Sequence, residues 1–186
     1  ESGCRVAEIL TIRIRNIAFD EYGAKITVFG KTGSRRIRVI SSANYLIGWL
    51  NKHPDKNNAS SFVWIKGKTR DQLLGYDRVR VLLARIAKKA GIQKKVNPHS
   101  FRHSRASYLA NYLTESQLKE VLGWTQASKM AAVYVHLSSK NTDEAILRIH
   151  GKEINFEDKK SDILNSKSCE RCKTSNEATN KFCKLC

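Results

Sequence analysis

The chain has 186 residues and a formal net charge of +17, from 34 lysines and arginines against 17 aspartates and glutamates. Its hydrophobic fraction of 41% is typical of a globular protein and excludes an intrinsically disordered one. This length allows one sizeable core, or one domain with a small appendage. So strong a positive charge favours a polyanionic partner, and we expect nucleic acid before an anionic membrane surface or an unspecific basic role.

The first half of the chain is predicted to form short helices around a β-hairpin. Two β-rich runs flank the glycine-rich turn from Gly30 to Ser34, which indicates an antiparallel pair. Ser41 or Ser42 is a suitable cap for the helix that follows. In order, the expected elements are a helix over 3–14, strands over 25–29 and 36–40, a helix over 41–53 and a short buried strand over 60–65.

The second half is predicted to be helical. Asn97 is a fair N-cap with Pro98 at the first helical position, and Thr114 with Gln117 forms a capping box. Gly123 stops the helix that Thr114 begins. The expected helices are a basic amphipathic one over 76–90, one that begins after Asn97, and others over 114–123, 127–137 and 143–150.

The end of the chain carries two Cys-x-x-Cys pairs behind a polar, mixed-charge linker. Four thiolates at this spacing predict a tetrahedral zinc site in a small knuckle or ribbon, and a redox dithiol fits two pairs poorly. Cysteines used in this way indicate a reducing compartment. Whether the module contacts DNA, contacts a partner or only caps the chain stays open. The ligands expected are Cys169, Cys172, Cys183 and Cys186.

We therefore expect an α+β fold that is mostly helical, with a small antiparallel sheet and a zinc module. The expected domains are a main domain over 1–150, a linker over 151–167 and the module over 168–186. No apolar run approaches the roughly 20 residues that a membrane span needs, and no segment resembles a signal peptide. The expected location is the cytoplasm.

Two histidines and an arginine fall on one stripe at the start of the predicted helix after Asn97. On a helix, His99, Arg102 and His103 lie on the same face, with small alanines behind them. Backbone N–H groups and the helix dipole attract an anion at such an end. The stripe predicts a phosphate site, although a His-x-x-Arg pair taken alone is weak evidence.

Other motifs stand in a fixed order around this stripe. They are Arg5 with Glu8 three residues later, Lys31 in the hairpin turn, His99-x-x-Arg102-His103, Leu122-Gly123-Trp124, and Tyr134 ten residues after the tryptophan. In this order they closely resemble the tyrosine recombinase, or phage integrase, family. Its pattern is a Gly-x-Arg-x-x-Glu helix, a hairpin lysine, His-x-[Leu/Phe]-Arg-His, Leu-Gly-[His/Trp] and a tyrosine. The resemblance covers about residues 2–150 and implies that family's catalytic domain.

The resemblance implies that Tyr134 attacks a DNA phosphodiester, forms a 3′-phosphotyrosyl bond and releases a 5′-hydroxyl. A phenol is a poor nucleophile at neutral pH and needs cations nearby. Arg5 and Arg102 would bind the two non-bridging oxygens, because arginine is always charged and can bind in a bidentate manner. Lys31 would protonate the departing 5′-oxygen.

The remaining motif residues receive supporting roles from the same resemblance. His99 would help to move the tyrosine proton or would hold a phosphate oxygen. Trp124, where many relatives have histidine, can only donate through its indole N–H. Glu8 would orient the arginines, and His103 would be a packing or supporting residue. No nucleotide and no catalytic metal are expected, because the covalent bond conserves the phosphodiester energy and no P-loop or acidic cluster is present.

The partner implied is double-stranded DNA. Arg35, Arg36 and Arg38 on the hairpin are expected to grip its backbone, as are several basic residues between 78 and 95. The resemblance further implies a homo-oligomer, a tetramer on DNA, in the nucleoid of a prokaryote or in a virus. The cysteine tail is similar to that of integrases of archaeal type.

Two other interpretations stay open at this point. One is a DNA-relaxing enzyme similar to type IB topoisomerases, which share this active site. The other is a zinc-bearing DNA-binding regulator with an inactive pocket. Because Arg5 stands almost at the start, we also expect an N-terminally trimmed domain, without the helical domain with which family members clamp the far side of DNA.

Overall fold

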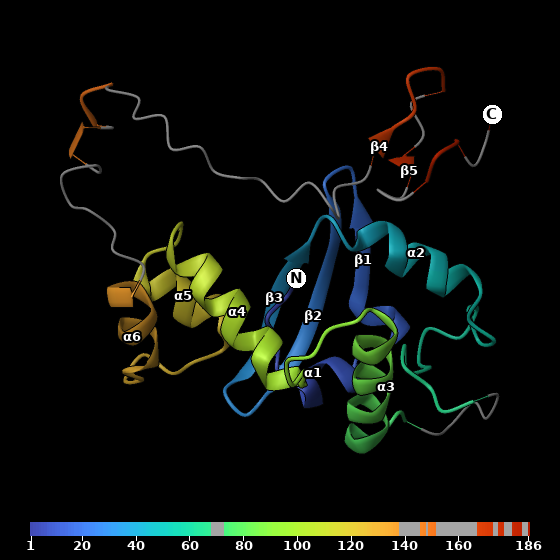
Figure 1. Cartoon of the computed structure of the whole chain (residues 1–186), viewed down its shortest axis with the longest axis horizontal. Helices are drawn as coiled ribbons and strands as arrows, with labels where there is room; N and C mark the ends of the chain where they lie inside the picture. The colour runs from blue at the N-terminus through green and yellow to red at the C-terminus, as the bar shows by residue number, and fades with distance from the viewer. Residues whose placement is uncertain are drawn as a thin grey trace.

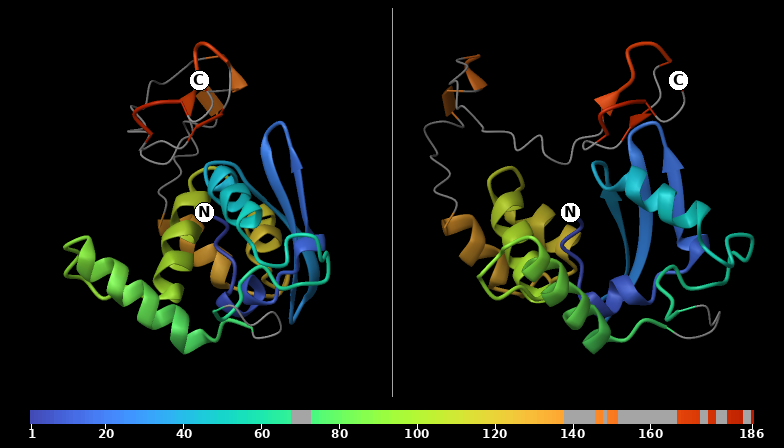
Figure 2. Two further views of the ribbon diagram at one scale, coloured as in Figure 1. Left: turned by 90° about the vertical axis from the view of Figure 1, so that its right-hand side faces the viewer. Right: turned by 45° about the vertical axis from the view of Figure 1, so that its right-hand side comes forward.

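The computed structural model describes residues 1–67, 73–137, 146–147, 149–151, 167–172, 175–176, 180–183 and 186. A small antiparallel sheet and α2 form one side of the molecule, and α4, α5 and α6 form the other (Figure 1, Figure 2). The elements are α1 (Val6–Leu10), a 3₁₀ turn (Ile14–Asn16), β1 (Ile17–Asp20), β2 (Gly23–Gly30), β3 (Gly33–Val39), α2 (Ala43–Asn51), α3 (Tyr76–Lys89), α4 (Pro98–Ala110), α5 (Glu115–Leu122), α6 (Met130–Leu137), β4 (Lys167–Ser168) and β5 (Ser175–Asn176). The predicted α+β, mostly helical fold is confirmed.

The sheet has the order β1-β2-β3, with both neighbouring pairs antiparallel. Its β2–β3 hairpin closes on the pair Gly30 and Gly33, so that Lys31 and Thr32 form the turn. Gly33 has a φ of 98°, a conformation in which a residue without Cβ is favoured. The sequence therefore predicted the hairpin and placed Lys31 correctly at its tip.

Two expectations at the start of the chain are wrong. The helix predicted over 3–14 ends at Leu10, and residues 12–14 instead pair with 61–63: Val63 N donates to Ile12 O at 2.9 Å and Ile14 N to Ser61 O at 3.0 Å. The strand predicted over 60–65 consequently forms isolated bridges, one of them between Arg13 and Phe62. Strand β1 was not predicted. These pairings join residues distant in sequence, which helical periodicity cannot reveal.

Helix boundaries set by local chemistry follow the prediction closely. The Asn97 side chain accepts from Ser100 N at 3.0 Å, and Thr114 and Gln117 exchange the two hydrogen bonds of a capping box. Ser42 caps α2 only through its backbone position. The helix expected at 127 begins at Met130, and half of the residues of the one expected over 143–150 lie outside the described ranges.

Two hydrophobic clusters hold the described chain together. One lies between the sheet, α1 and α2, and includes Ala24, Val28 and Val63. The other lies among α4, α5 and α6, and includes Leu118 and Leu122. The N-terminal segment passes between the two sides (Figure 1). Among the described residues, no helix has both the length and the apolar character to cross a membrane.

Candidate active site

The end of α5 gathers three arginines from distant parts of the chain. Gly123 takes a left-handed conformation, with φ 64° and ψ 45°, and ends the helix there. The last carbonyls of a helix carry partial negative charge and favour cations. Arg5 Nη1 donates to Gly123 O at 3.0 Å, Arg35 Nε to Val121 O at 3.0 Å and Arg102 Nη2 to Leu122 O at 2.7 Å.

Glu8, on α1, is the acidic residue within this cluster and is 3% exposed. Its carboxylate accepts from Arg5 Nη1 at 3.1 Å, and from Arg35 Nη1 and Nη2 at 2.8 and 2.7 Å. Burial by itself raises the pKa of the Glu8 carboxyl, but hydrogen bonds from Arg35 and Arg5 outweigh it and lower the pKa to about 2. Glu8 therefore stays ionised and holds both arginines through hydrogen bonds.

Arg102 is buried at the start of α4. Its Nη1 donates to Gly3 O at 2.9 Å, which joins the N-terminal segment to α4. Burial, and then repulsion from the Arg5 charge, lower the pKa of Arg102. A guanidinium nevertheless stays charged in proteins. Arg5, Arg35 and Arg102 thus oppose the single carboxylate of Glu8, and the excess positive charge suits a phosphate.

Tyr134, on α6, is 7% exposed and faces this cluster. Its ring is stacked on Trp124 with centroids 5.7 Å apart, and Arg102 Cζ lies 5.5 Å from the Trp124 ring centroid. Its hydroxyl contacts His103 Nδ1. Burial raises the pKa of the Tyr134 phenol, and the charge of Arg102 opposes that effect. The tryptophan therefore places the phenol beside a cation.

The two other predicted residues lie at the edge of the site. His99 is exposed, and its ring lies edge-on to His103 with centroids 4.2 Å apart. Lys31 is exposed in the hairpin turn, and within the described ranges no hydrogen bond or ion pair joins it to the arginines. Its neighbour Thr32 donates through Oγ1 to Gly123 O at 3.4 Å, so the turn lies against the end of α5.

The three hairpin arginines that were predicted as DNA contacts have different surroundings. Arg35 shares the inner face of β3 with the buried Ile37 and Val39, and its side chain is 9% exposed. Arg36 points outward, and Arg38 is paired with Asp20 at 2.8 Å. Sequence reasoning grouped the three, although the alternation of Arg35 with Ile37 and Val39 could have separated the first from the others.

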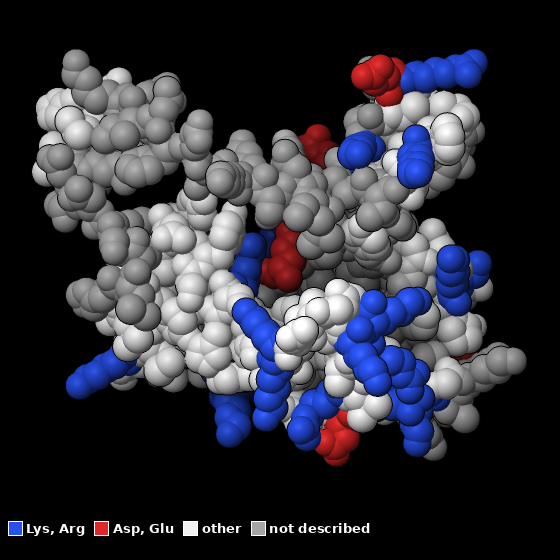
Figure 3. Space-filling view, in the orientation of Figure 1, with Lys and Arg blue, Asp and Glu red and all other residues white. Residues whose placement is uncertain are grey.

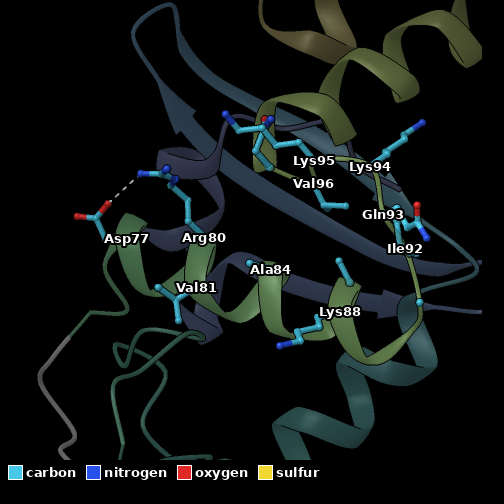
Figure 4. Close-up of a pocket in the computed structure, with 13 residues that line it drawn as sticks. Asp77, Arg80, Val81, Ala84, Lys88, Ile92, Gln93, Lys94, Lys95 and Val96 are labelled. Carbon is cyan, nitrogen blue, oxygen red and sulfur yellow. Dashed lines mark ion pairs between the residues drawn. The ribbon is translucent and has the colours of Figure 1, made fainter.

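A second basic surface lies along α3. An open groove of about 730 Å³ runs between α3 and the segment that leads into α4, and Figure 4 shows Arg80 and Lys88 on one wall with Lys94 and Lys95 on the other. Among the described residues, Asp77 is the one acidic residue that lines it, and it is paired with Arg80 at 3.5 Å. Lysines and arginines gather over this part of the molecule in Figure 3. Such a surface suits a phosphate backbone.

The four tail cysteines come together as predicted. Their sulfurs all lie within 4.8 Å of one another, and three of the pairs are 3.5–3.6 Å apart. Tetrahedral zinc–thiolate bonds of about 2.3 Å separate sulfurs by about 3.8 Å, which fits this cluster. The arrangement can hold a metal ion.

The fold is that of the tyrosine recombinases. A crystal structure of XerH site-specific recombinase bound to palindromic difH substrate in a post-cleavage complex matches with a TM-score of 0.61 and 21% identity, over 80% of this chain and 43% of that one. A crystal structure of XerA recombinase matches with a TM-score of 0.59 and 22% identity, over 83% and 54%.

Sequence comparison agrees with the fold. Residues 1–141 match the phage integrase family, and the chain belongs to that family. Tyrosine recombinase XerC of Corynebacterium glutamicum is 28% identical over 154 residues, which cover 80% of this chain and 47% of that protein. A tyrosine recombinase of Thermosipho africanus is 28% identical over 149 residues, or 80% and 50%. The chain therefore spans about half the length of these relatives.

Proposed function

We propose that this chain is the catalytic part of a site-specific DNA recombinase, which cuts and rejoins duplex DNA through a covalent bond to Tyr134. The observation that carries the proposal is the convergence of Arg5, Arg102, Trp124 and Tyr134 on the end of α5. The excess positive charge beside a buried phenol suits a phosphorane and disfavours a structural role for the tyrosine. The names of the relatives support the same activity.

In the proposed reaction, the Tyr134 oxygen attacks the phosphorus as the bond to the 5′-oxygen breaks. Arg5 and Arg102 hold the two non-bridging oxygens, where negative charge develops. Lys31 gives its proton to the departing 5′-oxygen. The tyrosine proton passes to His103, whose Nδ1 contacts the hydroxyl. Rejoining runs these steps in reverse, with the 5′-hydroxyl of another strand as the nucleophile.

The surrounding residues complete the proposal. Trp124 packs the nucleophile and offers its indole N–H to a phosphate oxygen, while His99 at the exposed edge holds the same phosphate. Arg36, Arg38 and the groove along α3 contact the DNA backbone. Several copies of the chain, four in the proposal, assemble on DNA. The tail cysteines hold a structural zinc ion, and no step of the reaction uses it.

Trapping on a suicide substrate tests the proposal. A nicked duplex that loses its short 5′-hydroxyl fragment prevents rejoining, so the wild-type chain should accumulate an adduct that denaturing electrophoresis resolves. Tyr134→Phe should shift the same DNA and form no adduct. Tyr108→Phe, an exposed tyrosine on α4, is the matched control and should form the adduct.

Three outcomes separate the interpretations. An adduct from wild type and none from Tyr134→Phe supports cleavage through Tyr134, and exchange of strands between two duplexes that carry a specific site then supports the recombinase. DNA binding without any adduct from wild type would instead support a regulator with an inactive pocket. Relaxation of supercoiled DNA that carries no specific site, without strand exchange, would support the topoisomerase-like alternative.

A further inference from the structure

Arg35 ties three elements together from inside the molecule. It lies on β3, opposite the buried Val28 of β2. Its two terminal nitrogens donate to the two carboxylate oxygens of Glu8 on α1, and its Nε donates to the carbonyl oxygen of Val121 on α5. This is the planar, forked geometry that arginine provides and lysine does not. With its nitrogens engaged and its side chain 9% exposed, Arg35 is not placed to grip a DNA backbone.

Two glycines make room for this ion pair. A Cβ at Gly30 would lie 2.4 Å from Glu8 Oε1, and a Cβ at Gly123 would lie 2.4 Å from Arg35 Nη1. Gly30 directly precedes Lys31, and Gly123 directly precedes Trp124. The ion pair therefore packs against the two stretches of backbone that carry the lysine and the tryptophan, at a distance that any larger residue would prevent.

Stability alone is a poor explanation for this arrangement. A buried ion pair is often no more stabilising than apolar residues of the same volume, because both charges lose their hydration. The bidentate contact instead fixes the orientation of Arg35 relative to Glu8, since two parallel hydrogen bonds keep the guanidinium and the carboxylate in one plane. This orientation fixes the position of the hairpin relative to α1, and therefore the position of Lys31 relative to Arg5.

We propose that Arg35 is a positioning residue, which holds the hairpin turn in register with α1 and the end of α5 so that Lys31 reaches the leaving oxygen of a phosphate bound by Arg5. The inference rests on the proposed function. It assigns Arg35 no contact with DNA. Loss of the bidentate contact between Arg35 and Glu8 should leave DNA binding nearly intact and should misplace the proton donor Lys31.

The test compares Arg35→Met with Arg36→Met, which removes the outward-facing arginine next to it. Both are measured in single-turnover cleavage, on an ordinary phosphodiester and on a 5′-bridging phosphorothiolate, whose thiolate leaving group needs no proton. Because misplacement of a catalytic group by about 1 Å can cost about 100-fold, we expect Arg35→Met to slow phosphodiester cleavage by about that factor. Most of the loss should be recovered on the phosphorothiolate, as for Lys31→Ala.

The contrast variant has a different signature. Arg36→Met should weaken binding, and the ratio of its rates on the two substrates should equal that of wild type. Arg35→Lys keeps the charge without the fork, retains more of the fold, and should show the same pattern as Arg35→Met to a smaller degree.

Two results would overturn the proposal. Equal losses on both substrates, in proportion to a lowered melting temperature, would make Arg35 a structural residue only. Weaker binding with unchanged cleavage of bound DNA would make it a phosphate contact. Adduct formation by wild type is measured first and tests the proposed function separately, because a chain that forms no adduct rejects that function before Arg35 is examined.

Discussion

Among single residues, the contact between His103 and the hydroxyl of Tyr134 bears most directly on the chemistry. A phenol whose pKa is raised by burial holds its proton tightly, so attack requires an acceptor. Imidazole is suited to that task near neutral pH. The family resemblance implied that His99 either moves the tyrosine proton or holds a phosphate oxygen. His99 and His103 share one helix face, and the packing of α6 places His103 against the tyrosine hydroxyl.

We predict that His103→Ala lowers the rate of adduct formation at pH 7 by about 100-fold, within the range of lost general-base catalysis. His99→Ala should lower it less and should weaken binding of the nicked DNA. A more acidic fluorinated tyrosine at position 134 should restore most of the rate to His103→Ala, because its phenol needs less help to ionise. Rapid-quench assays measure these rates.

The opposite pattern would assign the proton to His99. If His99→Ala causes the larger loss and responds to the fluorinated tyrosine, then His103 is the packing residue that the sequence suggested. If neither variant responds, the proton leaves directly to water.

At the scale of elements, the structure differs from the prediction where the contacting residues are far apart in the sequence. The caps at Asn97 and Thr114 involve neighbours within three residues, and the sequence predicted both. The shortened α1 and the placement of Arg35 depend on contacts with residues 27 to 86 positions away. The motif order predicted a set of site residues, since a reaction constrains their types, and the roles of these residues stay predictions. The inward placement of Arg35 was missed, although its alternation with Ile37 and Val39 along β3 was a signal for it.

The ion pair between Glu8 and Arg35 predicts that the folded chain loses stability in acid. The pKa of Glu8 is lowered from 4.5 to about 2 in the folded chain, so its contribution to stability is complete above about pH 4.5 and is lost as the pH falls through 2. That lowering corresponds to about 3 kcal/mol at most. Urea unfolding of wild type should show that the free energy of unfolding decreases as the pH is lowered from 5 to 2.5.

Glu8→Gln is the control, because it removes the titrating group and should flatten part of this slope. Asp20, whose pKa is also lowered by Arg38 and Lys25, contributes part of the remaining slope, and Asp20→Asn should remove that part. An unchanged slope in Glu8→Gln would show that the carboxylate is not held by the arginines in solution.

At the scale of the whole molecule, the candidate active site and the candidate metal ligands lie in different parts of the chain. The arginine cluster, Tyr134 and the basic groove all lie between residues 1 and 137, whereas the four candidate metal ligands lie between 169 and 186. Sequence spacing was sufficient to predict the module, because four cysteines in two pairs leave few other roles. The spacing of the cysteines reflects how they would bind a metal ion and carries no information about a partner of the module.

We predict one zinc ion per chain, lost on treatment with a strong chelator or in Cys172→Ala with Cys183→Ala. The tail should then become more susceptible to protease, because the module lacks a core large enough to fold without metal. Adduct formation on the suicide substrate should persist. Elemental analysis, limited proteolysis and electrophoresis measure the three effects. Loss of the adduct on chelation would contradict a purely structural ion.

Cys4, which directly precedes Arg5, packs in the hydrophobic cluster of the sheet side, and Tyr134 packs in the cluster of the helical side. Their meeting point is the only place where the described chain assembles a phosphate cage beside the phenol. Under the proposed function, a polypeptide in which either half has unfolded therefore lacks the assembled site and should not cleave DNA. Cleavage would then be confined to fully folded copies, without any need for an inhibitor.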